Sequence, residues 1–362
     1  MLSVEECRVG RVPTVDEWVA RLSARDARAR EEAQEALEEA LGSGEAESRE
    51  RTARALIQEL GRPGTAAASP ILFLLQRGWW PPQASLTASA VQAVLSMLPR
   101  MEAGSADLEH AALVLTLVCR VDASQLSALE GAFAHPHPSV RSAMARVVGR
   151  LGQDALPALP WVLALLDDEE SVAISALESL GSLAVLAPDV AAPRLLEQVR
   201  RTDGVRLYLA LVSLRGLLEE LLLEERAVPS LVGLESALLR ALDEPEPPIR
   251  QESVSLLGLL GPVSPVALAA LRDRLRDESP FVAAGAAVAL LGLGESSAEP
   301  LFLLKGQLGL ASSPEVQEAA LSALMSVDPA RLRRAKGMLE SVVGDTSGAT
   351  RVTLDDLLAS LD

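Results

Sequence analysis

Aromatic residues, cysteine, lysine and long hydrophobic runs are all scarce in this sequence. Aromatic side chains make up 2% of the 362 residues, whereas hydrophobic residues make up 49%. The interior must therefore be built from Leu, Ala and Val, which is largely helix-forming material. Valine does not alternate with polar residues over any length, and no Asn-Gly turn separates apolar runs, so a β architecture is not expected.

Residues that carry chemistry are also few. Cys7 and Cys119 lie too far apart for a CxxC site, and two cysteines suggest no disulfide framework. His135 and His137 share a turn, but no cysteine or nearby carboxylate completes a metal ligand set, and His110 lies upstream. No phosphate-binding loop, dinucleotide fingerprint or nucleophile elbow occurs. We therefore expect no enzyme activity, no cofactor and no metal.

Positive charge is limited, and the formal net charge is −17. Phosphate binding needs a positive field, so a nucleic-acid partner is disfavoured. Carboxylates gather in the segments 167–170, 243–246 and 277–278. Such turns stabilise helix N-termini and keep an edge soluble, or they form a docking ridge for a partner with a basic surface. Both interpretations stay open.

No apolar run has the length of a membrane span. The first 18 residues contain acidic side chains and no apolar core of a secretory signal, and glutamates bound the run Leu221–Leu223 on both sides. We expect a cytoplasmic protein without a membrane span.

A pattern of thirteen positions repeats along the chain. It begins at Val140 as VRSAMARVVGRLG and returns at Val172, Val205, Ile249, Val282 and Val316, with the copy at Val205 the loosest. The starts are 32, 33, 44, 33 and 34 residues apart. Weaker copies begin at Ala29 and Leu86. Such periods are typical of helical repeat proteins.

Each copy reads as an amphipathic helix, because positions one, five, eight, nine and twelve are mostly apolar and share one helix face. A first helix precedes most copies, across a short polar turn that often contains proline. These first helices are expected at Ala155–Leu166, Leu231–Leu242, Ala267–Leu275 and Glu299–Leu308. One such pair cannot bury its own apolar stripe, so neighbouring pairs must stack into a continuous core.

The turn followed by Val140-Arg141 or Ile249-Arg250, and the run that ends at Gly152 or Gly261, resemble the HEAT repeat family, particularly the short repeats of phycobilisome lyases. The resemblance implies an all-α, right-handed α-α superhelix of stacked antiparallel helix pairs. It also implies that second helices line the concave face, and that turn Asp and helix Arg groups support one another between repeats.

The regularity of the pattern divides the chain into three segments. Residues 1–123 are expected to form irregular N-terminal repeats or a cap, 124–328 regular repeats, and 329–362 C-terminal capping helices. The N-terminal helices are expected near 14–23, 26–42, 46–61, 67–77, 83–98 and 106–120. The closing helices are expected at Leu332–Val343 and Leu354–Leu361, with residues 344–350 as their linker.

Candidate partner-binding residues lie at positions three and seven, which point away from the apolar stripe. They include Arg146, Ile174, Glu178, Leu207, Leu211, Gln251 and Val288, with Tyr208 beside Leu207. An exposed apolar patch flanked by charge is typical of a partner site, but a shifted helix register would bury Leu207 and Tyr208 instead.

Two further features depart from the repeat. Trp79 and Trp80 form a pair in a Pro-Gly turn, which favours either a binding hot spot or packing over an irregular junction. Leucines spread around the helix at 214–223, which is poorly suited to water. That helix would cap a bend, form a homodimer with a second copy, or receive a partner.

The function expected from these observations is that of a non-enzymatic scaffold or adaptor, which binds a protein or peptide on its concave face. The alternative, from the same resemblance, is a bilin-lyase-like enzyme or enzyme subunit that binds a tetrapyrrole.

Overall fold

The computed structural model describes residues 13–42, 45–77, 80, 83–102, 105–295, 297–309, 312–325, 332–333, 336–343, 346 and 348–361. These residues form helices and no β-strand, so the all-α class predicted from the sequence is confirmed. None of the described helices is both long and apolar enough to cross a membrane.

The chain forms two compact units, unit 1 (Met1–Leu183) and unit 2 (Ala184–Asp362). This division follows contacts between helices, whereas the three segments expected above follow the regularity of the repeat. The three-segment division therefore stays a prediction.

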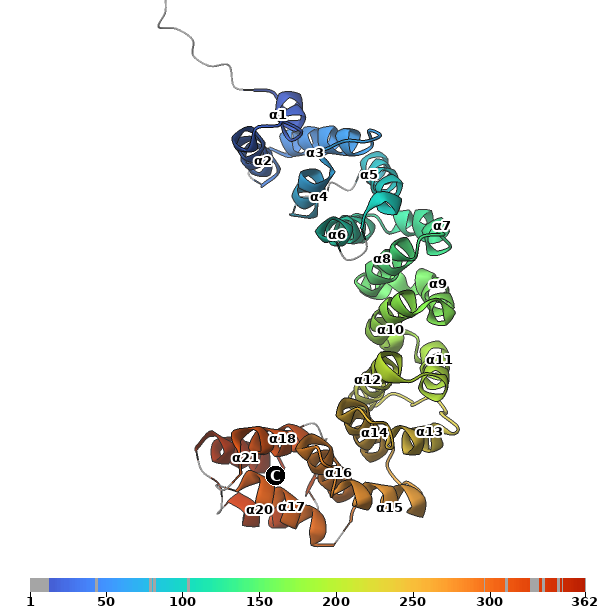
Figure 1. Ribbon diagram of the computed structural model, residues 1–362, viewed down its shortest axis with the longest axis vertical. Helices are drawn as coiled ribbons and strands as arrows, with labels where there is room; N and C mark the ends of the chain where they lie inside the picture. The colour runs from blue at the N-terminus through green and yellow to red at the C-terminus, as the bar shows by residue number, and fades with distance from the viewer. Residues whose placement is uncertain are drawn as a thin grey trace, which may run out of the picture. The chain divides into compact units, whose positions relative to one another are not determined.

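Unit 1 is a stack of helix pairs in two layers (Figure 1). Successive even-numbered helices contact one another in one layer, while α1, α3 and α5, and then α7 and α9, do so in the other. The helices are α1 (Val15–Arg21), α2 (Ala27–Gly42), α3 (Ala46–Leu60), α4 (Ala68–Arg77), α5 (Ala84–Met97), α6 (Ala106–Val121), α7 (Glu130–Phe133), α8 (Pro138–Gly149), α9 (Leu159–Ala164) and α10 (Glu170–Leu183). The six N-terminal helices match the predicted ranges to within two residues.

Unit 2 repeats the same two-layer arrangement (Figure 1). Contacts join α12, α14, α16 and α18 in one layer, and α11, α13 and α15 in the other. The helices are α11 (Pro188–Arg201), α12 (Gly204–Leu223), α13 (Leu234–Ala241), α14 (Pro247–Leu259), α15 (Pro265–Arg274), α16 (Pro280–Gly292), α17 (Glu299–Leu308), α18 (Pro314–Met325), α20 (Lys336–Val343) and α21 (Gly348–Ser360).

Proline marks the start of four second helices. α8, α14, α16 and α18 each begin at a proline, two residues before the apolar position that opens the repeat pattern. Proline suits the first helical position because its fixed φ is helical and the missing N–H has no partner there. The local sequence thus sets where these helices begin.

Proline also accounts for a wrong prediction. The continuous helix expected at Ala155–Leu166 is a 3-10 helix at Gly152–Ala158, a short α9, and a 3-10 turn at Leu165–Asp167. Pro157 and Pro160 remove two backbone donors, which interrupts the regular α-helical ladder.

One other expectation needs correction, because the last helix, α21, begins at Gly348, inside the segment expected to be a linker. The sequence left the pairing of the N-terminal helices open. The weak copy at Leu86 is α5, which contacts α3 and lies in the layer of first helices.

The register of α12 also differs from the prediction. Leu207 and Leu211 are fully buried, whereas Val205 is 56% exposed, so their expected exposure is wrong. Buried apolar residues recur at 207, 210, 211, 214, 217, 218 and 221, one stripe at helical spacing. The pattern therefore begins two residues before Val205, which puts both leucines at apolar positions.

The leucine-rich part of α12 belongs to the core of unit 2. Leu214, Leu217, Leu218 and Leu221 are buried, and only Leu222 and Leu223 at the end of the helix are exposed. Most leucines of the 214–223 segment thus pack inside the unit, and the homodimer through this helix stays a prediction.

Arginine and aspartate join successive repeats in the way the sequence resemblance implied. Arg250 donates to both oxygens of Asp277, at 2.9 and 2.8 Å, and to the carbonyls of Glu244 and Pro245. Arg141 binds Asp168 in the same bidentate way at 2.7 Å. In both pairs the partners are 27 residues apart, so each pair ties a second helix to the next turn.

We predict that Asp277→Asn lowers stability by about 3 kcal/mol, because it leaves the buried Arg250 without its counter-ion. Arg250 and Asp277 have 6% and 2% of their side chains exposed, against 14% and 20% for Arg141 and Asp168. Asp168→Asn should therefore lower the stability by less than Asp277→Asn does. Urea unfolding followed by circular dichroism measures both, and equal losses would contradict the role of burial.

The same pair sets a pH dependence. Burial alone would raise the pKa of Asp277, but hydrogen bonds from Arg250 and the Ser279 N–H, with the nearby arginine charges, lower it. A lowered folded-state pKa stabilises the protein above the carboxyl's ordinary pKa of about 4, and this contribution is lost as the pH falls through the lowered value. The urea midpoint of Asp277→Asn should therefore fall less on acidification than that of the wild type.

Second helices of neighbouring repeats approach closely at a glycine. A Cβ atom on Gly149 of α8 would lie 2.9 Å from the Cα of Ser179 on α10. The Ser179 hydroxyl donates to the Ala145 carbonyl at 2.7 Å, which bridges the same two helices. Only glycine permits this separation without moving a backbone.

We predict that Gly149→Ala destabilises unit 1 by about 1–3 kcal/mol through this clash. Gly216→Ala is the matched control, since Gly216 lies inside α12 with nothing within 4 Å of a Cβ. That substitution should stabilise by about 0.5–1 kcal/mol through helix propensity alone. Thermal and urea unfolding compare the two, and stabilisation by both alanines would refute the close approach.

Candidate functional site

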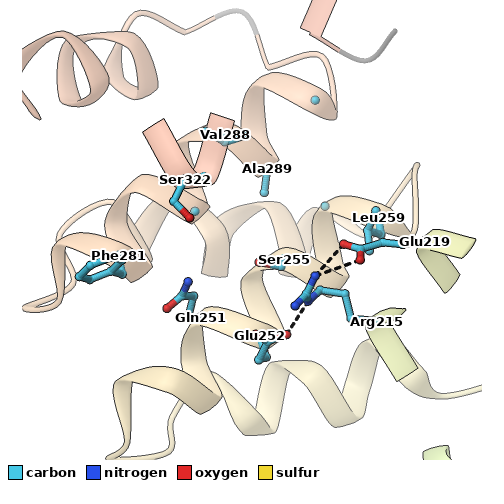
Figure 2. A pocket seen from close by; sticks show the side chains of 14 residues that line it. Arg215, Glu219, Gln251, Glu252, Ser255, Leu259, Phe281, Val288, Ala289 and Ser322 are labelled. Carbon is cyan, nitrogen blue, oxygen red and sulfur yellow. Dashed lines mark hydrogen bonds and ion pairs between the residues drawn. The ribbon is translucent and has the colours of Figure 1, made fainter. Parts of the chain in front are cut away.

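Unit 2 contains a cavity of about 130 Å³ on its layer of second helices. It receives side chains from α12, α14, α16 and α18, so four successive repeats contribute to one site (Figure 2). The lining residues are Arg215, Glu219, Gln251, Glu252, Ser255, Gly258, Leu259, Phe281, Gly285, Val288, Ala289, Gly292, Ser322 and Ala323.

Small residues leave the space for this cavity. A Cβ on Gly258 would lie 3.0 Å from the Cβ of Ala289, so α14 and α16 pack closely there. Gly285 and Gly292 add no side chain, and Val288 lines the cavity although only 1% of it is exposed. A side-chain-sized hollow results within the layer.

Arg215 is the one cation among the lining residues. Its Nε donates to Glu252 Oε2 at 2.6 Å, and Nη1 donates to both carboxylate oxygens of Glu219 at 2.8 and 3.0 Å (Figure 2). Burial alone would lower the pKa of Arg215, but these hydrogen bonds and the charges of Glu252 and Glu219 raise it. Arg215 is therefore a permanent cation held between two carboxylates.

Three neutral polar side chains face the same cavity without partners. Gln251 and Ser255 lie one turn apart on α14, and Ser322 lies on α18. Within the described residues, none of these three side chains makes a hydrogen bond. Gln251 and Ser255 are half-buried and Ser322 is exposed. The cavity thus offers unused donors and acceptors to a bound group.

The structure brings together two of the candidate partner-binding residues named above. Gln251 and Val288 both line the cavity, but the exposure expected for Val288 is wrong. Val288 is short, and α14 and α18 pack on either side of its helix. Tyr208 is half-buried and does not line the cavity. Whether these residues bind a partner stays a prediction.

Trp80, the described member of the tryptophan pair, is buried and does not form an exposed hot spot. Trp80 is 7% exposed, and its indole Nε1 donates to the Leu75 carbonyl at 3.1 Å. The prediction that Trp80 presents its ring to a partner is therefore wrong, because the ring packs back on the end of α4. Trp79 lies outside the described residues.

The remaining candidates belong to unit 1. Arg146 on α8 is half-buried, with Nε 3.9 Å from Glu109. On α10, Ile174 is half-buried and Glu178 is exposed. None of them lines the cavity of unit 2.

The charged residues of the cavity were missed at the sequence level, although one signal was present. Glu252 occupies position four of its repeat, where the copies at Val140, Val172 and Val282 have Ala143, Ser175 and Gly285. A carboxylate at a position otherwise filled by small residues requires a cation nearby. Its cation, Arg215, lies 37 residues earlier on another helix, which the sequence does not reveal.

A larger hollow of about 590 Å³ lies in unit 1, between α3 and α5. Its two arginines, Arg54 and Arg62, pair with Glu50 and Glu59. The side chains of these two arginines are 54% and 74% exposed, so this hollow lacks the mostly buried cation that distinguishes the cavity of unit 2.

Other reactive groups do not converge on a site. The rings of His135 and His137 stack at 6.1 Å, and His110 packs against Phe73. Among the described residues, no group of three or more His, Cys, Asp or Glu could hold a metal ion.

Comparison with known proteins identifies the repeat. A family model for HEAT repeats matches residues 234–325, which include α13 to α18 and most of the cavity. Residues 234–325 are thus similar to HEAT repeats, and the described residues on either side continue the same all-α stack of sequential helix pairs. No curated protein matches the sequence.

Two solved structures are similar at low identity. One, described as an engineered protein, is 16% identical with a TM-score of 0.49, and the match covers 97% of this chain and 99% of that one. The other is YibA of Escherichia coli, 13% identical with a TM-score of 0.49, covering 78% of this chain and 99% of its own.

We predict that Cys119 does not act as a nucleophile. It is 1% exposed, and burial, with a smaller effect of the Asp122 charge, raises its pKa to about 12. Only a trace of thiolate exists at neutral pH, and the thiolate is the reactive form. In Cys7→Ser protein, Ellman's reagent should label Cys119 only after denaturation. Rapid labelling of the native protein would contradict the burial.

Proposed function

We propose that this HEAT repeat chain is a non-enzymatic scaffold that binds a protein or peptide on the second helices of unit 2. HEAT repeats commonly mediate protein binding. The observation that carries the proposal is the cavity shared by α12, α14, α16 and α18, with three polar side chains that have no partner among the described residues. A packed stack presents such a surface preformed, so the ordering cost of binding falls mainly on the partner.

The charge of the protein supports a partner with a basic surface. The formal net charge is −17, and Asp243 and Glu278, in the turns at the end of the helix pairs, are 80% and 81% exposed. Each of these two carboxylates contacts one arginine, Arg274 or Arg250, but stays exposed, whereas Asp168 and Asp277 are 20% and 2% exposed and serve the packing of the repeats. The exposed carboxylates would speed the encounter with a cationic partner.

The cavity of unit 2 is small for the alternative of a bilin-lyase-like subunit. Small-molecule sites commonly have about 300–1,000 Å³, and the cavity has about 130 Å³. That alternative, like the resemblance to the lyase type of repeat, stays a prediction. The absorbance of the protein after incubation with a bilin would test it.

Site-specific photo-crosslinking in the native cells tests the scaffold. We predict that p-benzoylphenylalanine at Ser322 or Gln251 captures a discrete protein, because both side chains lie at the cavity. The matched controls are Val266 on α15 and Phe302 on α17, which are 66% and 75% exposed on the first helices.

The comparison between the two layers decides the result. Capture from the second helices and not from the controls supports the proposal. Capture of the same proteins from both layers, or only from Val266 and Phe302, would contradict it.

A further inference from the structure

The guanidinium of Arg215 is left open on one side, unlike that of the structural arginine Arg250. Every nitrogen of Arg250 has a partner, since Asp277, Glu278 and two carbonyls occupy Nε, Nη1 and Nη2. In Arg215, the carboxylates of Glu252 and Glu219 occupy Nε and Nη1 only. No hydrogen bond from Nη2, or to the second oxygen of Glu252, is found within the described residues. Arg215 and Glu252 can therefore each form a further hydrogen bond at the cavity.

The charge of the cavity decides which kind of group it favours. Its charged lining residues are one guanidinium and two carboxylates, with a net charge of −1. An added carboxylate would raise the negative charge of a largely buried site, whereas an added cation would neutralise it. The net charge of the whole chain, −17, acts in the same direction. A cationic ligand is favoured over an anionic one.

The size and the lining of the cavity indicate which kind of cationic group fits it. A cavity of about 150 Å³ is known to hold one benzene molecule, so about 130 Å³ suits a single side chain. The free acceptors come from several directions, since Ser255 and Gln251 lie on α14 and Ser322 on α18 (Figure 2). A planar guanidinium has five N–H donors spread around its edge, whereas an ammonium has three at one point. Phe281 adds an aromatic ring at the lining, against which a guanidinium can stack.

We propose that this cavity binds an arginine side chain of the partner, with Glu252 as its counter-ion and the hydroxyls of Ser255 and Ser322 and the amide of Gln251 as further acceptors. The inference rests on the proposed function, since it names the residue by which the scaffold recognises its partner. Arg215 is the positioning residue, because it holds Glu252 at the cavity by the 2.6 Å hydrogen bond.

The test uses the full chain with labelled methyl groups and two small probes. N-acetyl-L-arginine N-methylamide and its citrulline counterpart have almost the same shape, but citrulline is neutral. The arginine probe should shift the methyl signals of Val288 and Ala289 saturably in the millimolar range. The citrulline probe should bind at least about tenfold more weakly than the arginine probe, since it lacks the charge-assisted hydrogen bonds. Equal binding of the two probes, or no saturable shift of these signals by arginine, would overturn the proposal.

Two variants separate the site from the general charge of the protein. Glu252→Gln should weaken the arginine probe about tenfold. Glu220→Gln should leave it unchanged, because Glu220 is exposed on α12, carries the same charge and does not line the cavity. Equal weakening by both variants would mean that only the net charge attracts arginine, and would also overturn the proposal.

A third variant blocks the cavity without altering its charge. Ser322→Trp places a large ring at an exposed lining position and should abolish the shifts, whereas Val266→Trp on α15 should not. Retention of the shifts in Ser322→Trp counts against this cavity as the site.

The two proposals fail separately. If crosslinking at Ser322 captures a partner but the cavity does not distinguish arginine from citrulline, the scaffold stands and the arginine site falls. If the cavity selects arginine but crosslinking finds no protein at the second helices, the scaffold falls and the cavity binds a small cation instead.

Discussion

The burial of each repeat's apolar stripe by the next repeat is the constraint on which the structure depends. A helix pair such as α13 and α14 cannot cover its own stripe, so it is stable only when neighbouring pairs pack against it. The second helices must therefore lie side by side, and small residues such as Gly149 and Gly258 set how closely they approach. The cavity of unit 2 is a consequence of the same packing, because it opens where glycine and alanine leave space.

Buried charge is used in two different ways within this packing. Arg141 and Arg250 each donate hydrogen bonds to an aspartate of the next repeat's turn and to backbone carbonyls. Their guanidinium groups therefore hold successive repeats together. Arg215 instead lies between carboxylates of two helices and borders an open space. This difference in hydrogen bonding distinguishes a residue of the framework from a residue of a site.

Much of the fold could be predicted because its signals are local. The thirteen-position pattern places α8, α10, α14, α16 and α18 within a few residues, and prolines mark where most of these helices begin. The pairing of arginine with aspartate followed from the family resemblance. Gln251, at an outward position of its copy, does line the cavity. Local composition also explains the failure at Ala155–Leu166, where prolines interrupt a helix that periodicity alone suggested.

The sequence by itself determined the helical repeat, the order of its helices and the strongly negative net charge. The tertiary structure decided the register of α12, because only contacts with neighbouring helices show that Leu207 and Leu211 face inward. It also decided the site. Arg215 and Glu252 are 37 residues apart and meet only when α12 packs beside α14. The periodicity of the sequence shows which face of each helix is apolar. It does not show which residues of two helices come into contact, because that depends on how the helices pack.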